Sequence, residues 1–291
     1  MRAKSLIITL FGDVISQHGG EIWLGSIARS VEALGVNDRL VRTSVFRLVK
    51  EGWLEVEREG RKSFYGFTRS GSKEYQRAAQ RIYSAGDDSW HGSWQLLLPT
   101  NLPETQRDDF RRSLHWLGFR AISNGTFARP GGDEESIRDL LDEFDLSSGV
   151  VVMEAKTASL TTARQWRELV SDHWQLDNLE EEYRQIIGLF RPLKKALDKG
   201  KLPTPLEAFQ ARLLLIHEYR RILLRDTPLP SDLLPNRWQG TVARQLAQAL
   251  YRDLAKPSST YIQNELVNRQ GRLPESEHYF YQRFGGISKD L

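Results

Sequence analysis

The sequence predicts an α+β protein that is mainly helical, and three patterns support this fold class. Three helical segments near the N-terminus are followed by a stretch of alternating polarity. Residues 90–155 alternate between strand-like and helical patterns, whereas almost the whole chain after Thr161 has the helical period. We therefore expect an N-terminal domain at 1–85, a middle domain at 86–160 and an all-helical C-terminal domain at 161–291 for effector binding and dimerisation, with "GDD" at 86–88 as a linker.

The N-terminal segment has the element order of a winged helix-turn-helix. Helical spacing covers residues 5–17 and 25–34, and a third helix is expected after the N-cap Asn37 and before Gly52. In "WLEVEREGRKSFYGFT" the period changes to alternation, which predicts a hairpin. Its turn lies around "EGRK", and its expected pairs place Leu54 and Val56 opposite Tyr65 and Phe67. The alternative is a small helical domain with a hairpin and no nucleic-acid role.

The third helix of this segment, containing "VRTSVFRLVKEGW", has an apolar side and a cationic side. At about 100° per residue, Val41, Val45 and Leu48 share the apolar side. No carboxylate occurs between Arg39 and Lys50, although a solvated helix face usually mixes both signs of charge. The two interpretations are a solvated basic face and a helix that lies against phosphates. The opposite side holds Arg39, Arg42, Thr43, Phe46, Arg47 and Lys50, of which Phe46 is expected to pack beneath the hairpin.

The basic charge of the chain is concentrated in this segment. The net charge is only +3, but residues 1–85 carry 14 Lys and Arg against 9 Asp and Glu. Cations near a hairpin turn suit contact with phosphates, although Glu57 and Glu59 interrupt the charge here. We therefore expect double-stranded DNA as a partner. The candidate contacts are Arg39, Arg42, Thr43, Ser44, Arg47, Lys50, Arg58, Arg61, Lys62, Ser63 and Tyr65.

The middle segment predicts a ferredoxin-like α+β domain. "WHGSWQLLLPT" is expected to be a strand with Trp94, Leu96 and Leu98 on one side, and "PETQRDDFRRSLHWLGF" a helix. "AISNGTFARP" is expected to be a second strand, and "DEESIRDLLDEF" a second helix. The β-branched run "GVVVMEA" at 149–155 indicates a buried strand.

The C-terminal segment contains cations within apolar helical patterns. Helices are expected at 162–199, 204–226 and 239–254. In "LLLIHEYRRILLRD" the apolar stripe is interrupted by His217, Arg220 and Arg221. Because buried cations need anionic partners, either intraprotein salt bridges or a pocket for an anionic small molecule would explain them. Further candidate ligand contacts are Arg191, Lys194, Arg244 and Arg283.

Signatures of enzymes are scarce, and we expect no catalytic site, metal or cofactor. The chain has no cysteine, no phosphate loop and no histidine pair at metal-ligand spacing. A metal-dependent nuclease would have to use the acidic pairs Asp87–Asp88 and Asp108–Asp109 of the middle domain. No apolar run approaches the ~18 residues of a membrane span, and Asp13 argues against a signal peptide. A cytoplasmic protein without a membrane partner is expected.

Five blocks of the chain resemble successive blocks of one protein family. They are "GGEIWLGSIARSVEALG", "VRTSVFRLVKEGWL", "LLLIHEYRRILLRD", "LLPNRWQGTVARQL" and "YFYQRFGG", which occur in order between residues 19 and 286. Their combination is similar to the PaaX family of bacterial repressors of phenylacetic-acid catabolic genes.

The resemblance implies a winged-helix DNA-binding domain, an α+β middle domain and a helical C-terminal domain. It also implies a homodimer that binds operator DNA and is released by phenylacetyl-coenzyme A rather than by free phenylacetate. The eight tryptophans could hold an aromatic acyl group. The alternatives are a regulator of a different acyl-coenzyme A and a thioester enzyme with a DNA-binding appendage.

Overall fold

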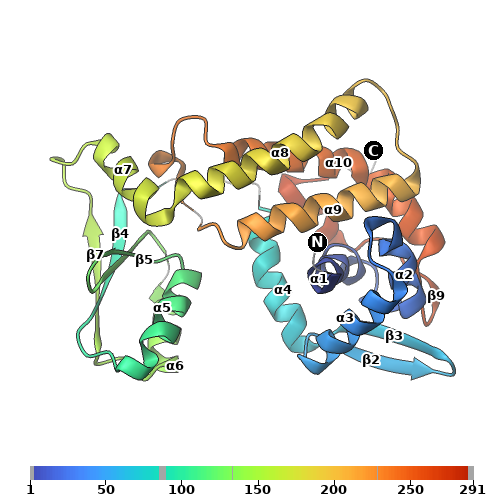
Figure 1. The fold of residues 1–291 in the computed structure, drawn as a ribbon, viewed down its shortest axis with the longest axis horizontal. Coiled ribbons are helices and arrows are strands. Elements are labelled where there is room, and N and C mark those ends of the chain that lie inside the picture. Colours follow the sequence, from blue (N-terminus) through green and yellow to red (C-terminus); the bar gives the residue numbers. More distant parts are fainter. Residues whose placement is uncertain (1–2, 85–89, 133, 228, 288–291) are drawn as a thin grey trace. The chain divides into compact units, whose positions relative to one another are not determined.

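The described part of the chain forms two compact units. The computed structural model describes residues 3–84, 90–132, 134–227 and 229–287 (Figure 1). The first unit combines residues 1–85, 183–224 and 241–291, and the second combines residues 86–182 and 225–240. The mainly helical α+β class is confirmed.

The N-terminal part of the first unit contains four α-helices. They are α1 (Ala3–Asp13), α2 (Leu24–Val31), α3 (Asp38–Lys50) and α4 (Arg69–Ile82), and short 3-10 segments follow α1 (Ile15–Gln17) and α2 (Glu32–Leu34). The side chain of Asn37 accepts a hydrogen bond of 3.0 Å from the backbone N of Leu40 and so caps α3 as predicted.

A three-stranded antiparallel sheet accompanies these helices. Strands β1 (Glu21–Trp23), β2 (Leu54–Glu59) and β3 (Lys62–Phe67) lie in the order β1-β3-β2. The predicted hairpin register is confirmed, because Leu54 pairs with Phe67 and Val56 with Tyr65. Strand β1 was not predicted, since three residues are too short to show an alternating pattern. The β2–β3 hairpin is called the wing below.

The C-terminal part of the first unit is mainly helical, and α9 (Pro205–Leu223) packs on α1. Its elements are most of α8 (Leu176–Asp198), α9, most of α10 (Gln239–Glu265), the strands β8 (Val267–Asn268) and β9 (Gly271–Arg272), and the 3-10 segment η5 (His278–Gly285). Helix α1 contacts both α3 and α9, and its residues Leu6, Ile7, Leu10 and Phe11 are fully buried. The β8–β9 ladder means that the expected all-helical segment is not wholly helical.

The second unit is a four-stranded antiparallel sheet with helices. Its sheet has the order β5-β6-β4-β7. In chain order the elements are β4 (Ser93–Pro99), the 3-10 segment η3 (Glu104–Gln106), α5 (Arg107–Trp116), β5 (Arg120–Ser123), β6 (Thr126–Pro130), α6 (Glu134–Glu143), β7 (Val150–Lys156), α7 (Ala163–Trp174) and the 3-10 segment η4 (Ser231–Leu233).

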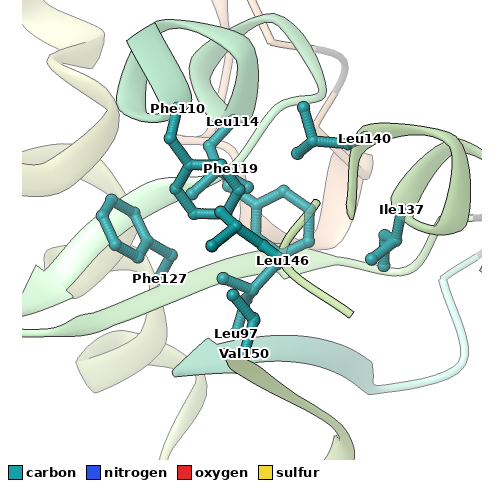
Figure 2. Close-up of a cluster of buried hydrophobic side chains, with 9 residues drawn as sticks. All are labelled: Leu97, Phe110, Leu114, Phe119, Phe127, Ile137, Leu140, Leu146 and Val150. Carbon is teal, nitrogen blue, oxygen red and sulfur yellow. The ribbon is translucent and has the colours of Figure 1, made fainter. Parts of the chain in front are cut away.

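The core of the second unit lies between α5, α6 and one face of the sheet (Figure 2). It consists of Leu97, Phe110, Leu114, Phe119, Phe127, Ile137, Leu140, Leu146 and Val150. On the other face, the ring of Trp94 stacks on Trp166 of α7 at a centroid distance of 4.8 Å.

Two expectations for this unit need correction. Residues 121–130 form two strands rather than one, because Asn124 and Gly125 supply the tight turn of a hairpin, with φ of 80° at Gly125. Strand β7 is an edge strand rather than a buried one, and Val151 and Met153 are 46% and 50% exposed. An uninterrupted apolar run gives no information about which strand lies at the edge of the sheet.

The expected boundary at 160/161 does not separate the two units. Helix α7 belongs with the sheet of the second unit, whereas α9 and most of α8 and α10 belong with residues 1–85. The expected linker "GDD" at 86–88 lies outside the described residues.

Candidate nucleic-acid interface and effector-site residues

The cationic side of α3 is exposed. Val41, Val45 and Leu48 are at most 1% exposed, and the opposite side faces solvent with Arg39, Arg42, Thr43, Phe46, Arg47 and Lys50. Ser44 lies among the buried residues at 8% exposure, so this member of the predicted contact set is not on the exposed face.

Most of the cations on this face form no ion pair with the residues that the structure describes. Nε of Arg42 lies 2.6 Å from Oδ2 of Asp38, which precedes it by one helical turn. Arg39, Arg47 and Lys50 form no ion pair with a described residue. The face therefore has an excess of positive charge, as a surface that binds a polyanion requires.

The prediction for Phe46 is wrong. Its side chain is 69% exposed rather than packed beneath the wing. Helix α3 packs on α1 and β2 through the side that carries Val41, Val45 and Leu48, and Phe46 lies on the opposite side between Arg42 and Arg47. The helix thus presents an aromatic ring within its cationic face.

The wing adds a second group of exposed cations. Glu59 pairs with Lys62, so Gly60 and Arg61 form a two-residue turn, and Gly60 adopts φ of 57°. Arg58, Arg61 and Lys62 are exposed, whereas Ser63 and Tyr65 are half-buried. Nζ of Lys62 also lies 5.4 Å from the ring centroid of Trp23 on β1. The predicted wing residues thus lie on one hairpin that follows α3 directly.

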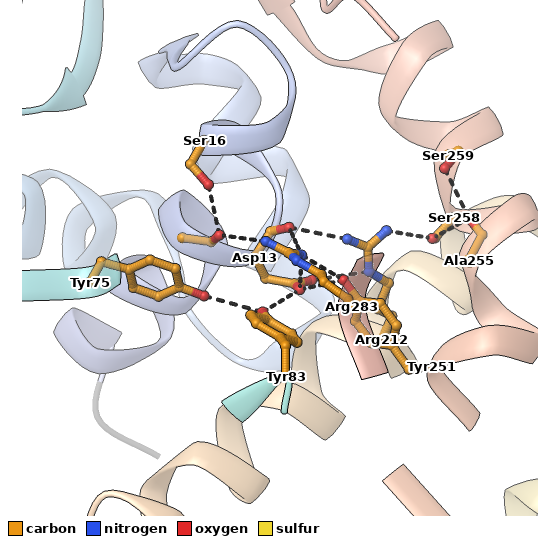
Figure 3. Close-up of polar contacts among 11 residues, drawn as sticks. Asp13, Ser16, Tyr75, Tyr83, Arg212, Tyr251, Ala255, Ser258, Ser259 and Arg283 are labelled. Carbon is orange, nitrogen blue, oxygen red and sulfur yellow. Dashed lines mark hydrogen bonds and ion pairs between the residues drawn. The ribbon is translucent and has the colours of Figure 1, made fainter. Parts of the chain in front are cut away.

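A buried carboxylate connects the N-terminal helices with the C-terminal ones (Figure 3). Asp13, at the end of α1, accepts hydrogen bonds on Oδ1 from the hydroxyls of Tyr83 at 2.6 Å and Tyr251 at 2.7 Å. Nη1 of Arg283 lies 2.9 Å from the same Oδ1, and Nε of Arg212 lies 3.0 Å from Oδ2. The side chains of both arginines are only 1% exposed. We call these five residues the Asp13 cluster.

The electrostatics of the Asp13 cluster favour its ionised form. Burial alone would raise the pKa of Asp13, but the charges of Arg212 and Arg283 and the two tyrosine hydroxyls lower the pKa below its usual value. The guanidinium of Arg283 also lies 4.0 Å from the ring centroid of Tyr83. Two guanidinium groups surround one carboxylate, so one positive charge exceeds the negative charge of Asp13. The faces of the aromatic rings stabilise part of this second positive charge.

His217 and Arg220 of the predicted ligand set face α1 rather than an open pocket. Nδ1 of His217 lies 3.3 Å from Oγ1 of Thr9, and Nη1 of Arg220 donates to the same Oγ1 at 2.9 Å. Arg220 also donates to the backbone O of Ser5 at 3.3 Å. Burial lowers the pKa of His217 to about 4, so its ring is neutral at pH 7. These two residues connect α9 to the first helix of the DNA-binding candidate.

The other predicted ligand contacts lie apart from one another. Arg283 belongs to the Asp13 cluster and lines a surface cavity of about 340 Å³ together with Tyr83, Tyr279 and neighbouring residues. None of the other six predicted ligand residues lines this cavity. Arg221 pairs with Glu218 at 3.2 Å, and Lys194 pairs with Asp198 and, at 3.5 Å, with Asp253. Arg191 is exposed on α8, and Arg244 is half-buried on α10.

The Asp13 cluster was largely missed in the sequence. Arg283 was predicted as a ligand contact, whereas Arg212, Tyr83 and Tyr251 were not singled out at all. A signal is present, since Asp13 is the only charged residue in the run "SLIITLFGDVI". A lone carboxylate in an otherwise apolar helix that is buried on all sides needs cationic partners.

The acidic pairs of the alternative nuclease are only partly described. Asp87 and Asp88 lie outside the described residues. Asp108 and Asp109 lie in the first turn of α5, where carboxylates suit the helix dipole, and Asp109 pairs with Arg112. Within the described ranges, no group of three or more His, Cys, Asp or Glu is placed to hold a metal ion. No helix in these ranges is long and apolar enough to cross a membrane.

Comparison with known proteins places the whole chain in one family. Residues 2–71 match the model of the PaaX-like protein, residues 87–167 that of the PaaX protein central Cas2-like domain, and residues 174–264 that of the PaaX-like protein C-terminal domain. Matches over all three segments confirm the resemblance noted in the sequence.

A curated relative supports this assignment, and a solved structure shares the fold. The chain is 39% identical over 288 residues to the transcriptional repressor PaaX of Escherichia coli (strain K12), covering 98% of this chain and 90% of the relative. The uncharacterized protein Rv0674 from Mycobacterium tuberculosis shares the fold, with a TM-score of 0.51 and 20% identity over 80% of this chain and 88% of that one. The chain belongs to the PaaX family.

The Asp13 cluster predicts a large cost for removing its carboxylate charge. Asp13→Asn leaves Arg212 and Arg283 buried without a countercharge, and we expect it to lower the free energy of unfolding by about 3–5 kcal/mol. Urea denaturation followed by far-UV circular dichroism measures this change. Asp38→Asn is the matched control, since the exposed Asp38–Arg42 pair should contribute about 1 kcal/mol or less. Equal effects of the two substitutions would contradict the role of the Asp13 cluster.

The buried histidines predict a loss of stability in mild acid. Burial lowers the pKa of both His18 and His217 from 6.5 to about 4. The unfolded chain therefore binds more protons between these pH values, and stability falls as the pH decreases through this window. Each histidine should contribute a slope of up to about 1.4 kcal/mol per pH unit. His217→Gln should reduce the slope measured by urea denaturation, and an unchanged slope in this variant would contradict this interpretation.

Proposed function

We propose that this protein is a DNA-binding transcriptional repressor that is released from its operator by an aromatic acyl-coenzyme A. The observation that carries the DNA-binding part is the exposed, largely unpaired cationic face of α3 directly before the basic wing. In this proposal residues 1–85 form a winged helix-turn-helix. Helix α3 enters the major groove, and Arg58, Arg61 and Lys62 contact phosphates or the minor groove. The repressor role of the E. coli relative supports it.

The exposed ring of Phe46 suits the same role. A solvent-exposed phenylalanine among cations offers an apolar contact to a thymine methyl group in the major groove. Arg39, Arg42, Arg47 and Lys50 around it can donate to guanine edges or phosphates.

The second unit is proposed to have the ferredoxin-like fold and to form the dimer, in place of the C-terminal helices to which the sequence analysis assigns dimerisation. The order β5-β6-β4-β7, with a helix after β4 and another after β6, is the arrangement of that fold. Val151 and Met153 expose apolar surface on an edge strand, which a second copy could cover. A homodimer would place two copies of α3 on half-sites about 34 Å or a multiple apart.

The proposed effector is phenylacetyl-coenzyme A, or a related aromatic acyl-coenzyme A. Arg220 supports an effector site near α9, because it is half-buried and no carboxylate of the described residues pairs with it. A ligand phosphate would attract this guanidinium and compete with its bonds to Ser5 and Thr9 of α1. Ligand binding would thereby change a contact of the DNA-binding segment. The ligand must favour a state that binds DNA poorly, since equal affinity for both states would shift nothing.

Removal of one unpaired cation from α3 should weaken operator binding. We expect Arg47→Ala to cost about 1–3 kcal/mol if the residue reads a base. The measurement is fluorescence anisotropy with DNA from upstream of the protein's own operon, at fixed salt. Arg77→Ala is the matched control, because Arg77 is an exposed helical arginine on α4 that pairs with Glu74. Unchanged affinity of both variants would place the DNA interface elsewhere.

The effector proposal predicts release of that DNA by the thioester alone. Titration with phenylacetyl-coenzyme A should lower the anisotropy, whereas free phenylacetate and coenzyme A should not, and the thioester should stay intact. Arg220→Ala should weaken the release of DNA by the thioester. The DNA affinity of the same variant without ligand, measured in the same experiment, is the reference. Equal release by free phenylacetate, or turnover of the thioester, would contradict the proposal.

A further inference from the structure

A short hairpin from the C-terminal region lies beside the wing sheet. Strands β8 and β9 pair Val267 with Arg272 and Asn268 with Gly271, and β8 contacts β1, one of the two edge strands of the wing sheet. The backbone N of Val267 donates to Oγ of Ser26 on α2 at 3.3 Å. The backbone N of Arg269 donates to Oε1 of Glu21 on β1 at 3.3 Å.

The base of this hairpin is anchored in the protein, whereas its turn is exposed. Leu266, Asn268 and Leu273 are buried, and the carbonyl of Pro274 accepts a hydrogen bond of 2.7 Å from Nδ1 of His18. The exposed residues between these anchors are Arg269, Gln270, Gly271 and Arg272. The hairpin therefore presents two arginines from a fixed position next to β1.

Arg269 forms ion pairs with two carboxylates, one on β1 and one on β2. Its Nε lies 2.8 Å from Oε2 of Glu21, and its Nη1 pairs with Glu57 of the wing. Glu57 precedes the wing turn at Gly60, on the same strand as Arg58. The negative charges that interrupt the basic pattern of the wing are thus partly neutralised by a residue more than two hundred positions later in the chain.

This pairing matters most near a polyanion. An unpaired carboxylate at position 57 would repel phosphates that approach Arg58, Arg61 and Lys62. Arg58, Arg61 and Lys62 form no ion pair with a described residue, so they stay available while Arg269 is occupied. Arg272 is likewise exposed and forms no ion pair within the described part of the chain.

We propose that the β8–β9 hairpin is a third part of the DNA interface, after α3 and the wing. Arg269 is a positioning residue that neutralises Glu21 and Glu57, and Arg272 contacts a phosphate beside the wing. This inference rests on the proposed DNA-binding function and assigns part of it to the C-terminal region.

A double-mutant cycle separates neutralisation by Arg269 from other effects. Arg269→Ala should lower the affinity for upstream DNA about fivefold at low salt, because exposed charge pairs are worth about 1 kcal/mol or less. In a Glu21→Gln, Glu57→Gln background, the same substitution should change affinity less than about twofold. Arg272→Ala should reduce the slope of log affinity against log salt by about one. Arg164→Ala, an exposed arginine paired with Glu168 on α7, should change neither quantity.

The outcomes distinguish this inference from the proposed function. An equal loss for Arg269→Ala in both backgrounds would overturn the neutralising role, as would no loss in either. An unchanged salt slope in Arg272→Ala would remove the hairpin from the interface.

If Arg47→Ala weakens binding while the hairpin variants do not, the repressor proposal stands and only the hairpin is excluded. If the unaltered protein does not bind the DNA at all, both proposals fail. Thermal unfolding midpoints of all variants confirm that each one is folded.

Discussion

The ionised side chain of Asp13 is the constraint on which the first unit depends. It ends the buried helix α1 and receives Tyr83 from the residues after α4, Arg212 from α9, Tyr251 from α10 and Arg283 from η5. Buried charges of this kind contribute specificity of arrangement more than net stability, because each misplaced partner leaves a charge without compensation. The position of α1, and with it the packing of α3, therefore depends on residues from the far end of the chain.

The Asp13 cluster also explains why the chain does not divide where the sequence patterns change. Periodicity detects helices and strands, and it correctly located α3, the wing register and the helices α5 and α6. It cannot show which helices share a core. The grouping of α9 with residues 1–85 depends on contacts such as Arg212 with Asp13 and Arg220 with Thr9, which join residues about two hundred positions apart.

The candidate interface was predictable to the extent that it is local. The exposed cations of α3 follow from helical geometry, and the wing cations from a hairpin turn. Phe46 was misplaced, and the burial of the candidate contact Ser44 was not foreseen, because the burial of a residue at the edge of a helix face depends on what covers that edge. The sequence could not show that Arg269 forms an ion pair with Glu57. This ion pair depends on the position at which the short β8–β9 hairpin packs beside the wing sheet. The ligand residues were identified as unusual cations, but the sequence could not show that His217 and Arg220 face α1.

The Asp13 cluster also has a consequence for synthesis of the chain. Asp13 precedes Arg283 by 270 residues, so helix α1 is synthesised long before this partner of Asp13. Until then the carboxylate of α1 lacks part of its native partners, so α1 can reach its final packing only after Arg283 has been synthesised. Long-range contacts of this kind form slowly and leave apolar surface exposed in the interim. A nascent chain of this protein therefore completes the packing of α1 only after η5 has been synthesised.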